Sequence, residues 1–128
     1  MPPRERGQVL KRWADAVEHD AVRLARLESA GSSRPIAQTV GGDVFDLAET
    51  IRFYGEYCDK LVGETTATED GVLALIRGEP YGVVGAITPW NFPFLTAAWK
   101  FAPALATGNA VVLKVSEITP FSVLAVAE

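Results

Sequence analysis

The sequence predicts an α/β fold, and it predicts that these 128 residues form only part of such a domain. The first observation is a strand–helix–strand pattern over residues 82–117, which is typical of a βαβ unit with parallel strands. The second is a pair of amphipathic helical patterns that precede it. The third is that two adjacent parallel strands are too few for a sheet that must bury both faces. We therefore expect N-terminal helices, a βαβ unit and the start of a further helix.

Two helices are expected in the first half of the chain. Apolar side chains recur every three or four residues over residues 4–30, and Gly31 supplies the stop. Residues 31–42 contain Gly, Ser and Pro and predict a connector. Asp43 is expected to cap a second amphipathic helix over residues 43–62.

The middle of the chain is expected to pass from a loop into strands. Residues 63–71 are polar and Thr-rich and predict a loop, and residues 72–81 predict a short strand followed by a turn. The apolar run Val83 to Ile87 is too short for a helix and rich in β-branched residues. Such a run is typical of a strand that is buried on both faces.

The βαβ unit continues with a helix and a second strand. Pro93 is expected to begin the helix, because its missing N–H costs nothing at the first position, and Gly108 is expected to end it. Residues 110–113 predict the second strand. Thr119 is expected to cap a further helix, which begins within residues 119–128.

Three polar residues follow the two strands of this unit. Asn91 comes after the first strand, and Lys114 and Glu117 come at the end of the second. Because parallel strands point the same way, all three are expected beyond the carboxyl edge of the sheet. Ligands bind at that edge in open α/β sheets, so a site is expected there.

Composition excludes several classes of protein. The formal net charge of −4 argues against a nucleic-acid partner. The most apolar span, residues 92–106, is too short to cross a bilayer, so no membrane partner is expected. A single cysteine rules out an internal disulfide and fits a reducing compartment, so the expected location is the cytoplasm. One cysteine and one histidine cannot supply the ligands of a metal site, and none is expected.

Many short runs at fixed spacing resemble the aldehyde dehydrogenase superfamily. The matching runs are Gly82-Val83-Val84-Gly85, Pro89-Trp90-Asn91-Phe92-Pro93, Ala98-Trp99-Lys100, Pro103-Ala104-Leu105-Ala106-Thr107-Gly108-Asn109, Leu113-Lys114, Ser116-Glu117 and Thr119-Pro120. The resemblance implies that residues 1–128 are the early part of a Rossmann-like cofactor-binding domain. It implies that the full-length protein is a homo-oligomer that oxidises a small aldehyde to a carboxylic acid with NAD, NADP being possible. In the family, the Gly-rich pyrophosphate turn, the catalytic cysteine and the glutamate base lie beyond the part that this chain covers, so the chain alone is expected to be inactive.

The resemblance also assigns roles to residues at the sheet edge. Asn91 matches the family asparagine whose amide donates to the developing oxyanion, and an amide can donate without being a competing acid at neutral pH. Lys114 and Glu117 match positions around the adenosine ribose, and Ser116 between them could help to bind a 2′-phosphate. The loop that lines the cofactor pocket is matched by Ile87, Thr88, Pro89 and Trp90.

The residue pattern by itself leaves other interpretations open. Asn91 also suits a helix cap, Lys114 and Glu117 suit a surface ion pair, and the loop residues suit simple packing. Val115 stands where most relatives have proline, so the loop after Lys114 is expected to be less rigid. The lone cysteine, Cys58, lies on an apolar helical stripe and is expected to be structural.

Two alternatives to a dehydrogenase remain for the whole chain. One is an inactive truncated remnant, or pseudoenzyme, that serves as an interaction module. The other is an unrelated α/β domain that uses the same sheet edge for a different nucleotide.

Overall fold

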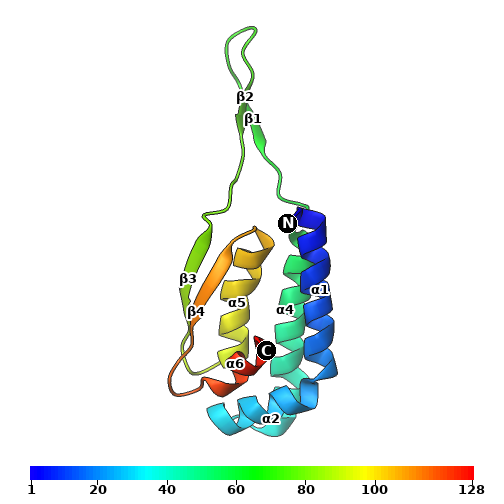
Figure 1. The fold of residues 1–128 in the computed structure, drawn as a ribbon, viewed down its shortest axis with the longest axis vertical. Helices are drawn as coiled ribbons and strands as arrows, with labels where there is room; N and C mark the ends of the chain where they lie inside the picture. Colours follow the sequence, from blue (N-terminus) through cyan, green and yellow to red (C-terminus); the bar gives the residue numbers. More distant parts are fainter.

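In a computed structural model that describes residues 1–128, a helical body packs against a small parallel sheet and a β-hairpin projects from one end (Figure 1). Helix α5 lies between the sheet and the pair α1 and α4, while α2 crosses the far end of the body. The elements in chain order are α1 Pro3–His19, α2 Ala21–Ser32, α3 Ile36–Gln38, η1 Thr39–Asp43, α4 Val44–Tyr57, β1 Glu64–Thr66, β2 Ala74–Ile76, β3 Val83–Ile87, α5 Pro93–Ala106, β4 Ala110–Lys114 and α6 Phe121–Val126.

The single helix predicted over residues 4–30 is wrong, because the chain breaks into α1 and α2 at Asp20. The backbone of Asp20 leaves the helical region (φ −98°, ψ 18°), and its N–H donates to the carbonyl of Ala16. The break turns α2 across the end of the body (Figure 1), so that apolar residues of both helices reach one core. Helix α2 also runs past Gly31 and ends before Ser33, which adopts the left-handed conformation with φ 60°.

The cap predicted at Asp43 is also wrong. Residues 31–42 contain α3 and most of a π-helical turn, η1, which leads directly into α4. Asp43 therefore has helical backbone angles and makes no capping bond. Its carboxylate instead pairs with Arg34 at 2.6 Å. Helix α4 ends at Tyr57, earlier than the predicted residue 62.

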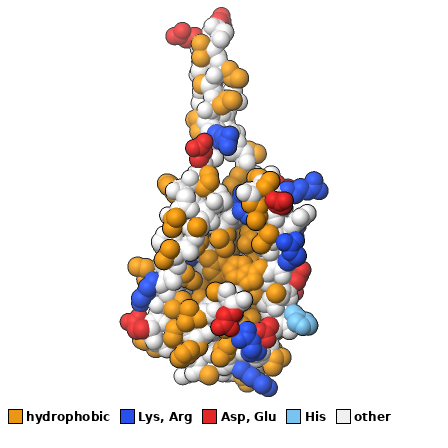
Figure 2. Space-filling view, viewed as in Figure 1, with side chains coloured by type: hydrophobic (Ala, Val, Ile, Leu, Met, Phe, Trp, Pro, Cys, Tyr) orange, Lys and Arg blue, Asp and Glu red, His pale blue; other side chains and the backbone are white.

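The loop predicted over residues 63–71 contains a strand. Strand β1 pairs antiparallel with β2, with Thr65 opposite Leu75. The hairpin is almost wholly exposed, and Figure 2 shows hydrophobic side chains along the projection. The exposed large hydrophobic residues there are Leu61, Val62, Val72, Leu73, Leu75 and Ile76. A Thr-rich sequence suits a strand as well as a loop, and only the partner strand decides between them.

The predicted βαβ unit is confirmed. Strands β3 and β4 pair in parallel, with Val83 opposite Ala110 and Ile87 opposite Lys114, and α5 connects them. Helix α5 begins at Pro93 as expected. Gly108 follows the helix with φ 94°, a conformation that favours glycine over residues with a Cβ.

Strand β3 is not buried on both faces within this chain. Only its Ala86 is buried, while Ile87 is 75% exposed. The hydrophobic core lies instead among the helices, around residues such as Leu47, Ile51 and Phe94. Helix α5 packs against one face of the two-stranded sheet, while strand side chains such as Val83, Ile87 and Val112 remain exposed.

The last helix, α6, packs on α2 and α5. Pro120 precedes its first residue, and the capping bond predicted for Thr119 is absent. None of the helices combines the length and the apolar character that crossing a membrane requires.

Candidate functional site

The carboxyl ends of β3 and β4 lie side by side, as the sequence predicts. Ile87 is opposite Lys114 in the parallel register, and the N–H of Thr88 donates to the Lys114 carbonyl at 3.1 Å. Thr88 is only 4% exposed, so it fixes the point at which the chain leaves the sheet. The loop after β3 and the loop after β4 therefore start from one rigid edge.

The turn from β3 to α5 exposes its central residues. Pro89, Trp90 and Asn91 are all exposed, Trp90 by 57%. The hydroxyl of Thr119 lies 3.4 Å from the Trp90 carbonyl and donates to it, which joins this turn to the loop after β4. Thr119 was expected to cap α6, and the backbone of the neighbouring turn takes its hydroxyl instead.

Asn91 does not cap the helix that follows it. The N-cap position of α5 belongs to Phe92, and no side chain of the turn makes a capping bond there. The Asn91 side chain also makes no other hydrogen bond within the chain. Its amide is therefore exposed and free to donate to a ligand.

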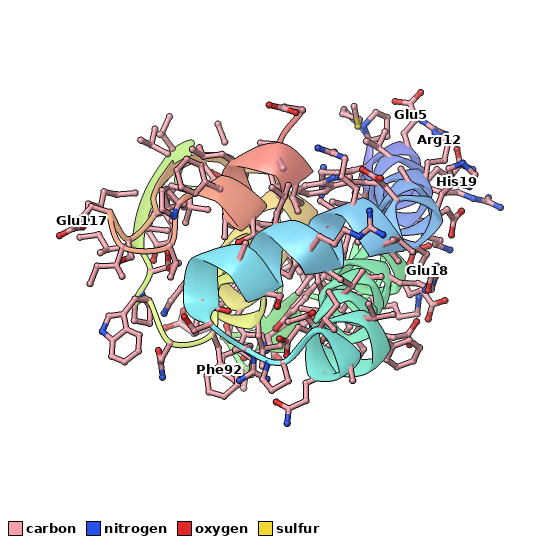
Figure 3. All side chains as sticks on the ribbon, turned by 90° about the horizontal axis from the view of Figure 1, so that it is seen from below. Glu5, Arg12, Glu18, His19, Phe92 and Glu117 are labelled. Carbon is pink, nitrogen blue, oxygen red and sulfur yellow. The ribbon has the colours of Figure 1, made fainter.

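Lys114 and Glu117 form an ion pair at the end of β4. Lys114 Nζ lies 2.7 Å from Glu117 Oε2, and both side chains are exposed. This hydrogen bond to Lys114 lowers the pKa of Glu117 below its ordinary value, so Glu117 is ionised at neutral pH. In the end-on view of Figure 3, Glu117 projects from one side of the molecule and Phe92 from another.

Ser116 lies between these two residues but is only 7% exposed. Its Oγ accepts a hydrogen bond from the N–H of Ile118 at 3.3 Å, so the hydroxyl shapes the loop. Val115, beside it, is half-buried and packs against the core. The loop after Lys114 is therefore held by its own bonds and by packing, although it lacks the family proline.

Two charged residues near the turn were not foreseen from the sequence. Glu28, on α2, is 1% exposed, and its Oε1 accepts a hydrogen bond from the N–H of Phe94 at 3.5 Å. Burial raises the pKa of Glu28. Arg34 lies 4.4 Å from the centroid of the Phe92 ring. One feature of the sequence could have pointed to Glu28. It follows Leu24 by four residues, on the buried stripe of α2, where a charged side chain is unusual.

The other candidate reactive side chains lie away from this edge. Cys58 is buried, and its thiol donates to the Tyr54 carbonyl at 3.4 Å. Burial raises the pKa of Cys58, which disfavours the nucleophilic thiolate. His19 is exposed at the end of α1 (Figure 3), and no group of three or more His, Cys, Asp or Glu side chains is arranged to hold a metal ion.

The family model described as the aldehyde dehydrogenase family matches residues 1–128. The chain belongs to this family. The pattern of short runs around the PWNFP turn, on which the resemblance rested, is thus a correct sign of family membership.

Relatives in the aldehyde dehydrogenase family match almost the whole chain. Retinaldehyde dehydrogenase 3 of Rattus norvegicus is 46% identical over 122 residues, which are 95% of this chain and 24% of the relative. The NADP/NAD-dependent aldehyde dehydrogenase PuuC of Escherichia coli strain K12 is 45% identical over 125 residues, 98% of this chain and 25% of the relative. The chain therefore spans about a quarter of the length of these curated relatives.

Solved structures agree with the fold described above. The crystal structure of PnpE in complex with nicotinamide adenine dinucleotide superimposes with a TM-score of 0.97 at 41% identity, covering 100% of this chain and 26% of PnpE. A putative aldehyde dehydrogenase from Burkholderia cenocepacia gives a TM-score of 0.97 at 46% identity, with 99% and 26% covered. The predicted fold class, an incomplete aldehyde dehydrogenase-like α/β cofactor-binding domain, is confirmed.

Proposed function

We propose that this chain supplies one catalytic group and part of the cofactor site of an NAD(P)-dependent aldehyde dehydrogenase, which oxidises a small aldehyde to a carboxylic acid. The observation that carries the proposal is the free, exposed amide of Asn91 beside the sheet edge that also bears Lys114 and Glu117. Residues 1–128 act as the early part of the cofactor-binding domain, and the remaining parts of the active site come from chain outside this segment.

The proposed role of Asn91 is to stabilise charge that appears during the reaction. When a cysteine thiolate from outside this segment attacks the aldehyde, the new C–S bond forms and the C=O π electrons move onto oxygen. The Asn91 N–H donates to that oxygen, and a donor fixed in advance favours the transition state over the ground state. NAD(P), when bound, would supply the acceptor for the hydride that leaves this carbon, and water would then hydrolyse the resulting thioester to the carboxylic acid. Cys58 does not supply the thiolate, because it is buried and its pKa is raised.

The proposed role of the Lys114–Glu117 pair is to bind the adenosine ribose. An ionised carboxylate accepts hydrogen bonds from ribose hydroxyls and repels a 2′-phosphate, whereas the ammonium group donates to either. The exposed pair provides both groups at the carboxyl edge, so the residues present fit a dinucleotide. We propose NAD as the preferred cofactor, with Ile87, Thr88, Pro89 and Trp90 lining its pocket. The burial of Ser116 leaves it a minor role toward NADP.

We further propose that the active protein is a cytoplasmic homo-oligomer. The lone, buried thiol suits a reducing compartment. The exposed apolar side chains of the hairpin suit burial against a second subunit or a further part of the same chain.

The test uses the complete gene product that contains this chain. Asn91→Ala should lower kcat for aldehyde oxidation by about 10²–10³, because one oxyanion donor is lost. The cofactor Kd should not change, since the amide contacts the aldehyde oxygen and not the nucleotide. Saturation kinetics and an equilibrium cofactor titration measure the two quantities separately.

Glu117→Gln is the matched control, since it should have the opposite effect. NAD should bind more weakly and discrimination against NADP should fall, while kcat at saturating cofactor is nearly kept. If Asn91→Ala weakens NAD binding and leaves kcat unchanged, the oxyanion role is wrong. If the wild-type gene product forms no NADH or NADPH with any aldehyde, the chain is an inactive relative and the proposed function is wrong.

A further inference from the structure

The turn that carries Asn91 is held by residues from two distant parts of the chain. On the strand side, Thr119 bonds to the carbonyl of Trp90. On the helix side, residues of the N-terminal half reach Phe92 and Phe94, which lie one and three residues beyond Asn91. The Asn91 side chain makes no hydrogen bond of its own within the chain, so these neighbouring residues set the position of its amide group.

Arg34 holds Phe92 through its guanidinium group. The guanidinium carbon lies 4.4 Å from the centroid of the Phe92 ring, within the range of a cation–π interaction. The group is itself fixed, because it donates to both carboxylate oxygens of Asp43, at 2.6 Å and 2.9 Å. This fork-to-carboxylate geometry defines the plane of the guanidinium, and a lysine cannot reproduce it.

Glu28 holds the first turn of α5. Pro93 has no N–H, and the first bond within the helix runs from the N–H of Thr96 to the Phe92 carbonyl at 3.0 Å. The N–H of Phe94 is thus one of the donors that the helix cannot satisfy itself. Glu28 Oε1 accepts it at 3.5 Å, and a carboxyl group near a helix N-terminus also suits the helix dipole. The second oxygen, Oε2, is buried as well.

We propose that Glu28 and Arg34 are positioning residues for the reaction, which set the orientation of the Asn91 amide by holding the residues that follow it. The proposal rests on the proposed role of Asn91 as an oxyanion donor. A donor must stand at a defined place relative to the developing charge, and small displacements have large effects on rate. The helical body, which takes no direct part in binding, then contributes to catalysis through this turn.

The decisive experiment is a double-mutant cycle in the complete gene product. Arg34→Ala and Glu28→Ala should each lower kcat by about tenfold, with cofactor Kd unchanged. In the Asn91→Ala background the same substitutions should leave kcat within about twofold, because they act only through the amide that is already missing. Glu28→Gln keeps a carbonyl oxygen for the Phe94 N–H, so it should restore most of the kcat lost in Glu28→Ala.

Arg52→Ala is the matched control for the loss of an arginine ion pair. Arg52 pairs with Asp15, Glu18 and Glu49 on the helices and makes no contact with the turn, so its removal should leave kcat unchanged. If Glu28→Ala does not fold, the cycle with the partly exposed Arg34 still decides the question.

The outcomes separate this inference from the proposed function. Additive losses in the double mutants, or an unchanged kcat in Arg34→Ala, overturn the positioning role while the role of Asn91 stands. An unchanged kcat in Asn91→Ala overturns the oxyanion role of Asn91, on which this inference rests, and a wild-type gene product without dehydrogenase activity overturns the proposed function itself.

Discussion

The helical body and the strand region of this chain use apolar side chains in opposite ways. In the body, Ile51 and Ala98 are fully buried, with 0% of their surface exposed. In the strand region, Leu73 is 73% and Tyr81 is 95% exposed. The body therefore closes a core within these residues, whereas the strands present apolar surface that the chain does not cover. The candidate site lies between the two. Asn91 comes just before α5, the helix that packs against both the sheet and the other helices.

This difference explains how a segment of a quarter of its relatives' length can hold a site in place. The turn at Asn91 is anchored on the body through α5, which packs against α1 and α4. The hairpin makes no contribution to that anchoring, since almost all of its residues are exposed. Stability of the site should thus depend on the body far more than on the hairpin.

The largest expected effect tests this contrast directly with one change made in each region. Leu47→Ala removes a side chain that is 1% exposed and should lower the free energy of unfolding by about 2–5 kcal/mol. Leu73→Ala makes the same change at a 73% exposed position and should change it by less than about 0.5 kcal/mol. Urea unfolding of the 128-residue chain, followed by tryptophan fluorescence at low protein concentration, measures both. Equal losses would mean that the hairpin folds back onto the body in solution.

A smaller effect concerns the buried carboxyl in the body. Burial raises the pKa of Glu28 above its ordinary value of 4.5; interactions with Ser122 and with the Phe94 N–H lower it in part, and the smaller charge effects of Asp43 and Arg34 act in opposite directions. The folded state then holds the Glu28 proton more tightly than the unfolded state, so stability falls as the pH rises above about 4.5. Glu28→Gln removes this contribution, so the variant should gain stability relative to wild type as the pH is raised.

Unfolding midpoints of the two proteins, measured from pH 4 to pH 8, check this prediction. The midpoint of Glu28→Gln minus the midpoint of wild type should increase steadily from the acid end toward neutral pH. A constant difference across the range would show that Glu28 titrates normally and is not buried in solution.

The smallest expected effect is at the lone cysteine. Cys58→Ala in the complete gene product should leave kcat within about twofold, because the thiol is a small buried side chain with a raised pKa. Steady-state kinetics measure this. A complete loss of turnover would identify Cys58 as the nucleophile and would contradict its position inside the helical body.

Local rules and motif spacing were sufficient to determine much of this protein. Proline at a first helical position predicted the start of α5 at Pro93, and a glycine with positive φ marked its end at Gly108. Two short β-branched runs around that helix predicted the parallel pair β3–β4. The polar residues after those strands predicted where the candidate site lies, and the spacing of the PWNFP motif predicted the family.

Only the tertiary structure decided the features that depend on partners distant in sequence. The break at Asp20 follows from the need of two helices to reach one core, which the continuous apolar pattern of residues 4–30 does not reveal. The strand β1 exists because β2 pairs with it. Glu28 reaches Phe94 across 66 residues of sequence. Periodicity shows which face of an element is apolar, but it does not show which residues pack against that face. The positions of the groups around Asn91 depend on that packing.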